Sequence, residues 1–230
     1  LWAAELKSKI LKTTPNYSFP SQKYRFLNSI DIDSAYAFKG KGFARFAGGF
    51  LNSIFKGKFS DVKSRINYLF FKKDPYNTYA ILKAGHRKHG PKMSYFFLLG
   101  DRGKFDKNLS YRSKTLQQLI QTLQRDHIVG IHPSYASNSN TKKIGVEKNR
   151  LEKITNLSVK RSRQHFLKLN FPETYENLIS NAVTEDFTMG FASQIGFRAG
   201  ICTAYPFFNL ERNEERPLLI HPFQVMDGTL

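Results

Sequence analysis

The 230-residue sequence contains a single cysteine, Cys202. One thiol cannot build an internal disulfide framework or a cysteine-rich zinc site, and this scarcity favours a reducing cytoplasm. The chain also has no apolar run near the ~18 residues that a membrane helix needs, and no signal-peptide pattern opens it. We therefore expect a cytoplasmic protein without a membrane span.

Acidic residues are scarce: 18 Asp and Glu face 36 Lys and Arg, which gives a formal charge of +18. A charge of this size favours anionic partners such as nucleic acid, acidic lipid or anionic polysaccharide. The basic residues are, however, spread along the chain and interrupted by apolar residues, as on a solvated basic surface. Net charge alone therefore gives little support to a nucleic-acid partner.

The apolar residues make up 40 % of the chain and include 21 Phe and 11 Tyr, enough for a substantial core. Their spacing predicts helices that alternate with short strands, which is typical of parallel β-α-β units in an α/β fold. The main helices are expected over 2–13, 59–70, 74–90, 113–126, 146–156 and 172–181. The glycine-punctuated segment 40–55 lacks a complete phosphate-loop pattern, so hinge flexibility and helix packing explain its glycines better.

The stretch "LNSIDIDSAYAF" places Asp31 and Asp33 two residues apart in a predicted strand. Side chains at this spacing point to the same face of a strand, so the two carboxylates would stand side by side and repel each other. Either a bound cation or a division of acid and base roles would explain the pair.

Further polar residues lie near the ends of other predicted strands. His132 ends "IVGIH", Arg163 and His165 share one face of "KRSRQHF", and Asp186 lies in "TEDFT". Because chemistry in α/β folds is found where strands end and loops begin, we expect these residues to converge on one site.

Asp33, His132 and His165 offer the oxygen and nitrogen ligands that zinc or another divalent cation prefers, and three ligands leave one position open. Asp31 is then the candidate general base, and Arg163 would pair with it and keep its pKa low enough to function. Arg198 either binds an anionic group or pairs with Asp186.

Seven segments in this order resemble the bacterial polysaccharide deacetylase-like proteins of the NodB-homology group, in particular a subgroup whose first motif is Asp-x-Asp. They are "SIDIDSAYAFKGKG", "KDPYNTY", "SYFFLLGDRGKFDKN", "VGIHPSYASN", "SRQHFLKL", "TEDFTMGFASQIGFRAG" and "HPFQVMDGTL". The resemblance runs from about Tyr24 to Leu230. It implies a distorted, incomplete (β/α) barrel and metal-dependent hydrolysis of an N- or O-acetyl group on a sugar.

The resemblance also implies roles for individual residues. Asp31 maps to the base and Asp33 to a metal ligand, and Arg163 falls where the family has the arginine that orients the base. His132 opens a His-x-x-x-His motif whose second position here is Ala136. Either His165 replaces that ligand, or metal binding is weak or lost. For the family's late histidine, a general acid, His221 is the only candidate.

Two aromatic residues, Tyr36 and Tyr135, are candidates to stack on a sugar ring, with Asp186 and Arg198 as further substrate contacts. We expect residues 1–20 to form a leading helix and linker. Residues 21–230 would form the barrel domain, truncated at its C-terminal end.

Three functional hypotheses follow. The first is a metal-dependent deacetylase, with zinc as the expected ion and an amino sugar or polysaccharide as substrate. The second is a catalytically impaired glycan-binding or assembly module of the same fold, which the alanine at position 136 favours. The third is a basic nucleic-acid-binding protein, supported only by net charge.

Overall fold

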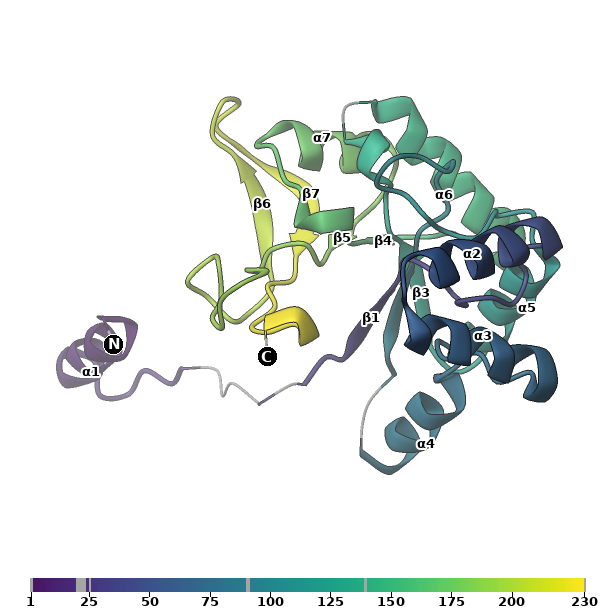
Figure 1. Ribbon diagram of the computed structural model, residues 1–230. Helices are drawn as coiled ribbons and strands as arrows, with labels where there is room; N and C mark the ends of the chain where they lie inside the picture. The colour runs from purple at the N-terminus through teal and green to yellow at the C-terminus, as the bar shows by residue number, and fades with distance from the viewer. Residues whose placement is uncertain (1, 20–23, 25, 90–91, 139, 230) are drawn as a thin grey trace.

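A seven-stranded sheet forms the centre of the protein (Figure 1). The computed structural model describes residues 2–19, 24, 26–89, 92–138 and 140–229. Its strands are β1 (Ser29–Ile32), β2 (Ser94–Phe97), β3 (Ile128–Ile131), β4 (Arg161–Ser162), β5 (Glu185–Asp186), β6 (Tyr205–Asn209) and β7 (Glu214–Ile220). They are ordered β1-β2-β3-β4-β5-β7-β6, and every neighbouring pair is parallel except β6 and β7.

Six α-helices lie between the parallel strands in the described part of the chain, and one more precedes the first strand. In chain order, beginning with the helix before the first strand, they are α1 (Trp2–Thr13), α2 (Phe43–Phe55), α3 (Phe59–Phe71), α4 (Tyr79–His89), α5 (Lys114–Leu123), α6 (Thr141–Thr155) and α7 (Glu173–Ser180). Short 3-10 turns occur at η1 (Tyr135–Ser137), η2 (His165–Leu167) and η3 (Asp227–Thr229). The expected α/β class is confirmed. The sheet stays open, with β1 and β6 at its edges, so the barrel is incomplete.

The core lies between the sheet and helices α5, α6 and α7. Every residue of β2 is buried, which is typical of a central parallel strand covered on both faces. In α5 the residues Leu116, Leu119, Ile120 and Leu123 are buried, and their spacing of three and four places them on one stripe of the helix. The amphipathic pattern that predicted this helix thus reflects its packing against the sheet.

Two helix starts differ from the sequence prediction: α6 begins at Thr141 rather than at 146, and α4 begins later than expected. The segment 74–90 was expected to be helical from Asp74, but α4 begins only at Tyr79. The Asp74 carboxylate instead accepts hydrogen bonds from the backbone N–H groups of Ala37, Phe38, Lys39 and Tyr76. Burial alone would raise the pKa of Asp74, but these four hydrogen bonds lower it. Asp74 therefore joins two distant segments rather than capping a helix.

The N-terminal helix α1 has no buried residue, and Figure 1 shows it away from the sheet. The predicted division at residues 20 and 21 lies outside the described residues. Among the helices that the structure describes, not one has the length and apolar character needed to cross a bilayer.

Candidate metal and catalytic site

The candidate residues lie at the C-terminal edge of the parallel strands. Asp33 directly follows β1, His132 directly follows β3 and Arg163 directly follows β4. The backbone pairing continues one residue past the strands: His132 N–H donates to the Phe97 carbonyl and Arg163 N–H to the Ile131 carbonyl. Because this ladder holds the backbone at the strand ends, the side chains project from fixed positions.

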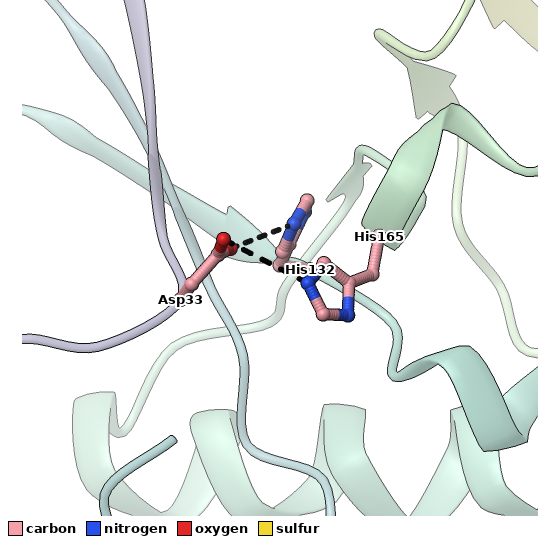
Figure 2. A group of neighbouring side chains, drawn as sticks. All are labelled: Asp33, His132 and His165. Carbon is pink, nitrogen blue, oxygen red and sulfur yellow. Dashed lines mark ion pairs between the residues drawn. The ribbon is translucent and has the colours of Figure 1, made fainter. Parts of the chain in front are cut away.

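Three candidate ligands meet at this edge. The Asp33 carboxylate lies 3.2 Å from Nε2 of His132 and 3.7 Å from Nε2 of His165, and Figure 2 shows it facing both rings. One ligand atom from each of the three residues lies within 4.8 Å of the others. His165 thus provides the second imidazole that position 136, an alanine, does not provide.

The second nitrogen of each imidazole has a partner of its own. Nδ1 of His132 lies 2.6 Å from the Arg163 carbonyl oxygen, and Nδ1 of His165 lies 2.9 Å from the Asp106 carboxylate. A carbonyl oxygen only accepts hydrogen bonds, so Nδ1 of His132 carries a hydrogen, and Nε2, which faces Asp33, is the nitrogen that a cation would meet. Histidines that bind metals are commonly oriented in this way, by a carbonyl or a carboxylate behind the ring. The donor set therefore fits a divalent cation.

The charges within this cluster are mutually stabilising. Partial burial alone would raise the pKa of Asp33, but hydrogen bonds to His132 and His165 lower it far below its usual range. Burial alone would lower the pKa of His165, but its hydrogen bonds to Asp33 and Asp106 raise it. Asp33 is consequently held ionised, which is the form that binds a cation.

Arg163 orients the other carboxylate of the pair. Its Nη1 lies 3.3 Å from Asp31 Oδ1, its Nη2 donates to Ser29 Oγ at 2.7 Å, and its Nε donates to the Phe187 carbonyl at 2.9 Å. The Arg163 side chain is buried, whereas 30 % of the Asp31 side chain is exposed. The Asp31 carboxylate is thus held by a buried guanidinium group, while part of its side chain stays open to solvent.

Asp31 and Asp33 both approach the ring of His132. Asp31 lies 4.0 Å from Nδ1 and Asp33 lies 3.2 Å from Nε2. Each carboxylate also has a neighbour of its own, Arg163 for Asp31 and His165 for Asp33, and these offset the repulsion between them. Asp31 and Asp33, although only two residues apart, therefore lie in two different electrostatic environments.

Two of the expected substrate contacts are buried in the structure. Tyr36 is only 6 % exposed and packs edge-on against Tyr79, so its ring offers no face to a sugar. Asp186 is completely buried and accepts hydrogen bonds from Ser162 Oγ and from both N–H and Oγ1 of Thr188. These hydrogen bonds indicate a structural role for Asp186. The prediction that Tyr36 and Asp186 contact substrate is therefore wrong, because both side chains are buried.

Two other expected contacts are accessible. Tyr135 is half-buried, and its ring lies 4.3 Å from that of Phe105 and 5.7 Å from that of Phe166. Arg198 is exposed, and Asp186 makes its hydrogen bonds elsewhere, so the expected pair between them is not formed. His221, the expected general acid, stacks on Phe187, and its Nε2 lies 3.0 Å from the Glu185 carboxylate.

Sequence reasoning missed several residues that support the site. Asp106 holds both His165 and the backbone N–H of Tyr135. The buried Glu147 accepts hydrogen bonds from the N–H and the hydroxyl of Ser134, and so anchors the loop after His132. Phe166, next to His165, has a positive φ of 59°, which bulky residues rarely adopt. The segment "GDRGKFDKN" contains Asp106, but only the fold shows which residue it meets.

Comparison with known proteins bears on the fold alone. No protein-family model matches the chain, and no curated protein matches it. Among solved structures it is similar to a protein from Mycobacterium smegmatis described as a "putative polysaccharide deacetylase", with a TM-score of 0.50 and 11 % sequence identity. The match covers 88 % of this chain and 62 % of that protein. The chain thus has a polysaccharide deacetylase-type fold and spans less than two thirds of the neighbour's length.

Proposed function

We propose that the protein is a metal-dependent hydrolase that removes acetyl groups from an amino sugar or polysaccharide, of the Asp-x-Asp kind. One observation carries this proposal: an aspartate and two histidines converge beside a second aspartate that is held by a buried arginine. The fold of the structural neighbour supports the same reaction class. The likeness is to the fold, so the reaction itself rests on the site.

Asp33, His132 and His165 would hold the ion, and their one oxygen and two nitrogen donors suit zinc. A divalent cation at this position would supply Lewis acidity toward the acetyl carbonyl and acidity to a neighbouring water. Asp106 and the Arg163 carbonyl would keep both imidazoles in the orientation that binding requires.

Asp31 would act as the general base. Its carboxylate takes a proton from the water whose oxygen forms a bond to the acetyl carbon, while Arg163 fixes the carboxylate position. The bond between that carbon and the sugar nitrogen or oxygen then breaks, and the protonated Asp31 can return its proton to the leaving atom. Acetate and the deacetylated sugar are the products, and the base is restored.

The sugar would lie against the aromatic side chains beside His165. Phe166 packs edge to face against Phe105 and Tyr135, whose rings are tilted against each other, and both Phe rings are exposed. Aromatic faces of this kind suit the apolar face of a sugar ring. The positive charge of the protein suits an anionic glycan.

The test combines metal analysis with acetate release. The purified protein is expected to contain a stoichiometric divalent ion and to release acetate from penta-N-acetylchitopentaose or from acetylated xylan. Asp33→Ala should abolish both properties, and Asp61→Ala, at an exposed residue in α3, should change neither. An ion without acetate release from either probe would favour the glycan-binding module. Absence of any bound ion would overturn the proposal.

A further inference from the structure

The segment from Lys39 to Lys73, here called the 39–73 hairpin, exposes apolar side chains that helices usually bury. It contains α2 and α3, which Figure 1 shows as neighbouring helices at the periphery of the molecule. In α2, "FARFAGGFLNSIF", the only buried residue is Ser53, and α3 has no buried residue. The exposed apolar side chains are Phe43, Leu51, Ile54, Phe55, Phe59, Ile66, Leu69, Phe70 and Phe71.

The hairpin is nevertheless a defined structure. Phe46 of α2 and Tyr68 of α3 meet at 5.9 Å, and the Arg65 guanidinium lies over the Phe46 ring. A Cβ on Gly49 would lie 2.6 Å from the Arg65 side chain, so the glycine allows the two helices to approach closely. At the base, Asp74 binds the N–H groups of residues 37–39 and thereby ties the two ends of the hairpin together. Its exposed aromatic residues are therefore presented by a fixed scaffold.

The turn between the helices concentrates this exposure. Phe55 is 87 % exposed and Phe59 is 82 % exposed, and between them lies the sequence Lys56-Gly57-Lys58. Gly57 has a φ of +61°, a conformation that favours glycine, and this allows the chain to reverse tightly between the helices. Two phenyl rings flanked by two lysines thus stand at the tip.

The charge of the hairpin is almost entirely of one sign. Between Lys39 and Lys73 there are nine Lys and Arg residues and one acidic residue, Asp61. Helices that lie in the interface of a bilayer combine basic residues with Phe and Leu in this way. Cores of protein–protein interfaces are instead depleted of lysine, and the hairpin has Lys56 and Lys58 directly between the highly exposed rings of Phe55 and Phe59.

We propose that the 39–73 hairpin docks the protein onto the surface of a bilayer that contains anionic lipid. Phe55 and Phe59 enter the interface between headgroups and acyl chains, and the surrounding lysines and arginines contact lipid phosphates. The helices lie on the membrane and do not cross it, in agreement with their length. This inference is independent of the proposed deacetylase activity.

The test is co-sedimentation of the whole protein with large unilamellar vesicles. One set contains phosphatidylcholine alone, and the other is an equal mixture of phosphatidylcholine and phosphatidylglycerol. We expect at least about tenfold tighter binding to the anionic vesicles, and weaker binding as salt is added. Equal binding to both sets, or binding to neither, would overturn the proposal.

Two double variants separate the apolar and the electrostatic contributions. Phe55→Ser with Phe59→Ser, and Lys56→Glu with Lys58→Glu, should each reduce binding to anionic vesicles at least about tenfold. The matched controls are Leu210→Ser with Ile195→Ser, both exposed apolar residues, and Lys142→Glu with Lys153→Glu, both exposed on α6. The charge controls change net charge equally, so a comparable loss in them would show that only bulk charge matters and would contradict the proposal.

A competing occupant would give a different result. If a second copy of the chain covers the hairpin, sedimentation velocity without vesicles should show a dimer that Phe55→Ser with Phe59→Ser dissociates. That outcome, with no vesicle binding by the wild type, would replace the bilayer with a protein interface and reject the proposal. Circular dichroism of each variant confirms that the fold is retained.

Discussion

The C-terminal edge of the sheet and the 39–73 hairpin both invert the usual distribution of residues, but in opposite directions. At the sheet edge, polar and charged side chains such as Arg163, His165 and Asp106 are buried. In the hairpin, phenyl rings such as those of Phe55 and Phe59 are exposed. Buried charges and exposed apolar patches are the informative departures from the rule that apolar residues lie inside.

The two regions differ in what stabilises their unusual residues: partners within the chain do so at the sheet edge but not, among the described residues, in the hairpin. Each buried charge at the sheet edge has partners within the chain, as Arg163 has with Asp31, Ser29 and Phe187. The exposed rings of the hairpin have no comparable cover in the described residues. The charges at the sheet edge therefore have their partners within the chain, whereas the exposed rings of the hairpin are suited to a large external surface.

The largest effect on the free energy of unfolding at the sheet edge is expected when Arg163 is replaced. Replacement by Met would leave the Phe187 carbonyl without its buried donor and the partly exposed Asp31 without its cation, and an unsatisfied buried acceptor costs about 1–3 kcal/mol. Urea denaturation measures this loss. Arg212→Met is the control, because the Arg212 side chain makes an exposed ion pair with Glu214 and its loss should change stability by less than about 1 kcal/mol.

The more conservative Arg163→Lys separates stability from catalysis. A lysine keeps the charge but loses the planar fork that holds Asp31 and Ser29 together, so acetate release should fall about a hundredfold. The bound ion should remain, because Asp33, His132 and His165 are unchanged. Equal activity of this variant would show that Arg163 does not position the base.

Asp186 tests whether the hydrogen bonds around a buried acid outweigh the effect of burial on its pKa. Burial raises the pKa of Asp186 to about 6, although Thr188, Ser162 and Arg163 lower it in part. The folded protein therefore holds this proton more tightly than the unfolded chain. The resulting stabilisation is present at about pH 4 and is lost as the pH rises through 6.

The Asp186→Asn variant cannot lose a proton at this position. A raised pKa of this size corresponds to about 3 kcal/mol below the usual pKa of an aspartate, so the stability of the wild type relative to the variant should fall by about 2 kcal/mol between about pH 4 and 7. Urea denaturation at both pH values measures the difference. A wild type that gains on the variant as the pH rises would show that its hydrogen bonds outweigh burial.

Asp106 tests how far the site depends on residues behind the ligands. Asp106→Asn keeps the shape of the side chain but weakens the acceptor for Nδ1 of His165, so zinc affinity should fall about 10- to 100-fold. Isothermal titration calorimetry with zinc measures this directly, without reference to activity. Asp101→Asn is the control, since Asp101 is largely exposed and pairs with Arg150. Unchanged affinity would limit Asp106 to holding the Tyr135 loop.

Much of the site can be predicted from the sequence because it follows from the geometry of strands. The spacing of Asp31 and Asp33 gives their shared face, and the ends of parallel strands bring His132 and Arg163 to the same edge. The same reasoning predicts the α/β fold from alternating helices and strands. These inferences need only local periodicity and a general rule of topology.

The remainder depends on tertiary contacts that no local pattern encodes. Asp106 and His165 are 59 residues apart, and only the fold shows that they meet. Tyr36 and Asp186 follow or end strands like the site residues, but their side chains turn into the interior. Asp74 looks like a helix cap, whereas its four N–H donors include three from residues 37–39. The position of a residue at the end of a strand predicts that it lies at the C-terminal edge of the sheet. Whether its side chain faces solvent or the interior depends on tertiary packing.

The smallest effect on the free energy of unfolding is expected when exposed phenyl rings of the hairpin are replaced. Phe55→Ser with Phe59→Ser should change the free energy of unfolding by only about 0.5 kcal/mol, because both rings are already exposed to water. Acetate release from a soluble oligosaccharide should also be unchanged. Phe97→Ala in β2 is the matched core variant, and the loss of that fully buried ring should cost about 3–5 kcal/mol.

Urea denaturation of the three proteins places the hairpin and the core on one scale. If the double variant loses several kcal/mol, its phenyl rings are covered within the chain and the hairpin is part of the core. If only the core variant is destabilised, the exposed rings contribute nothing to folding. An apolar tip that does not stabilise its own fold has its physical role outside it, as a membrane-docking surface requires.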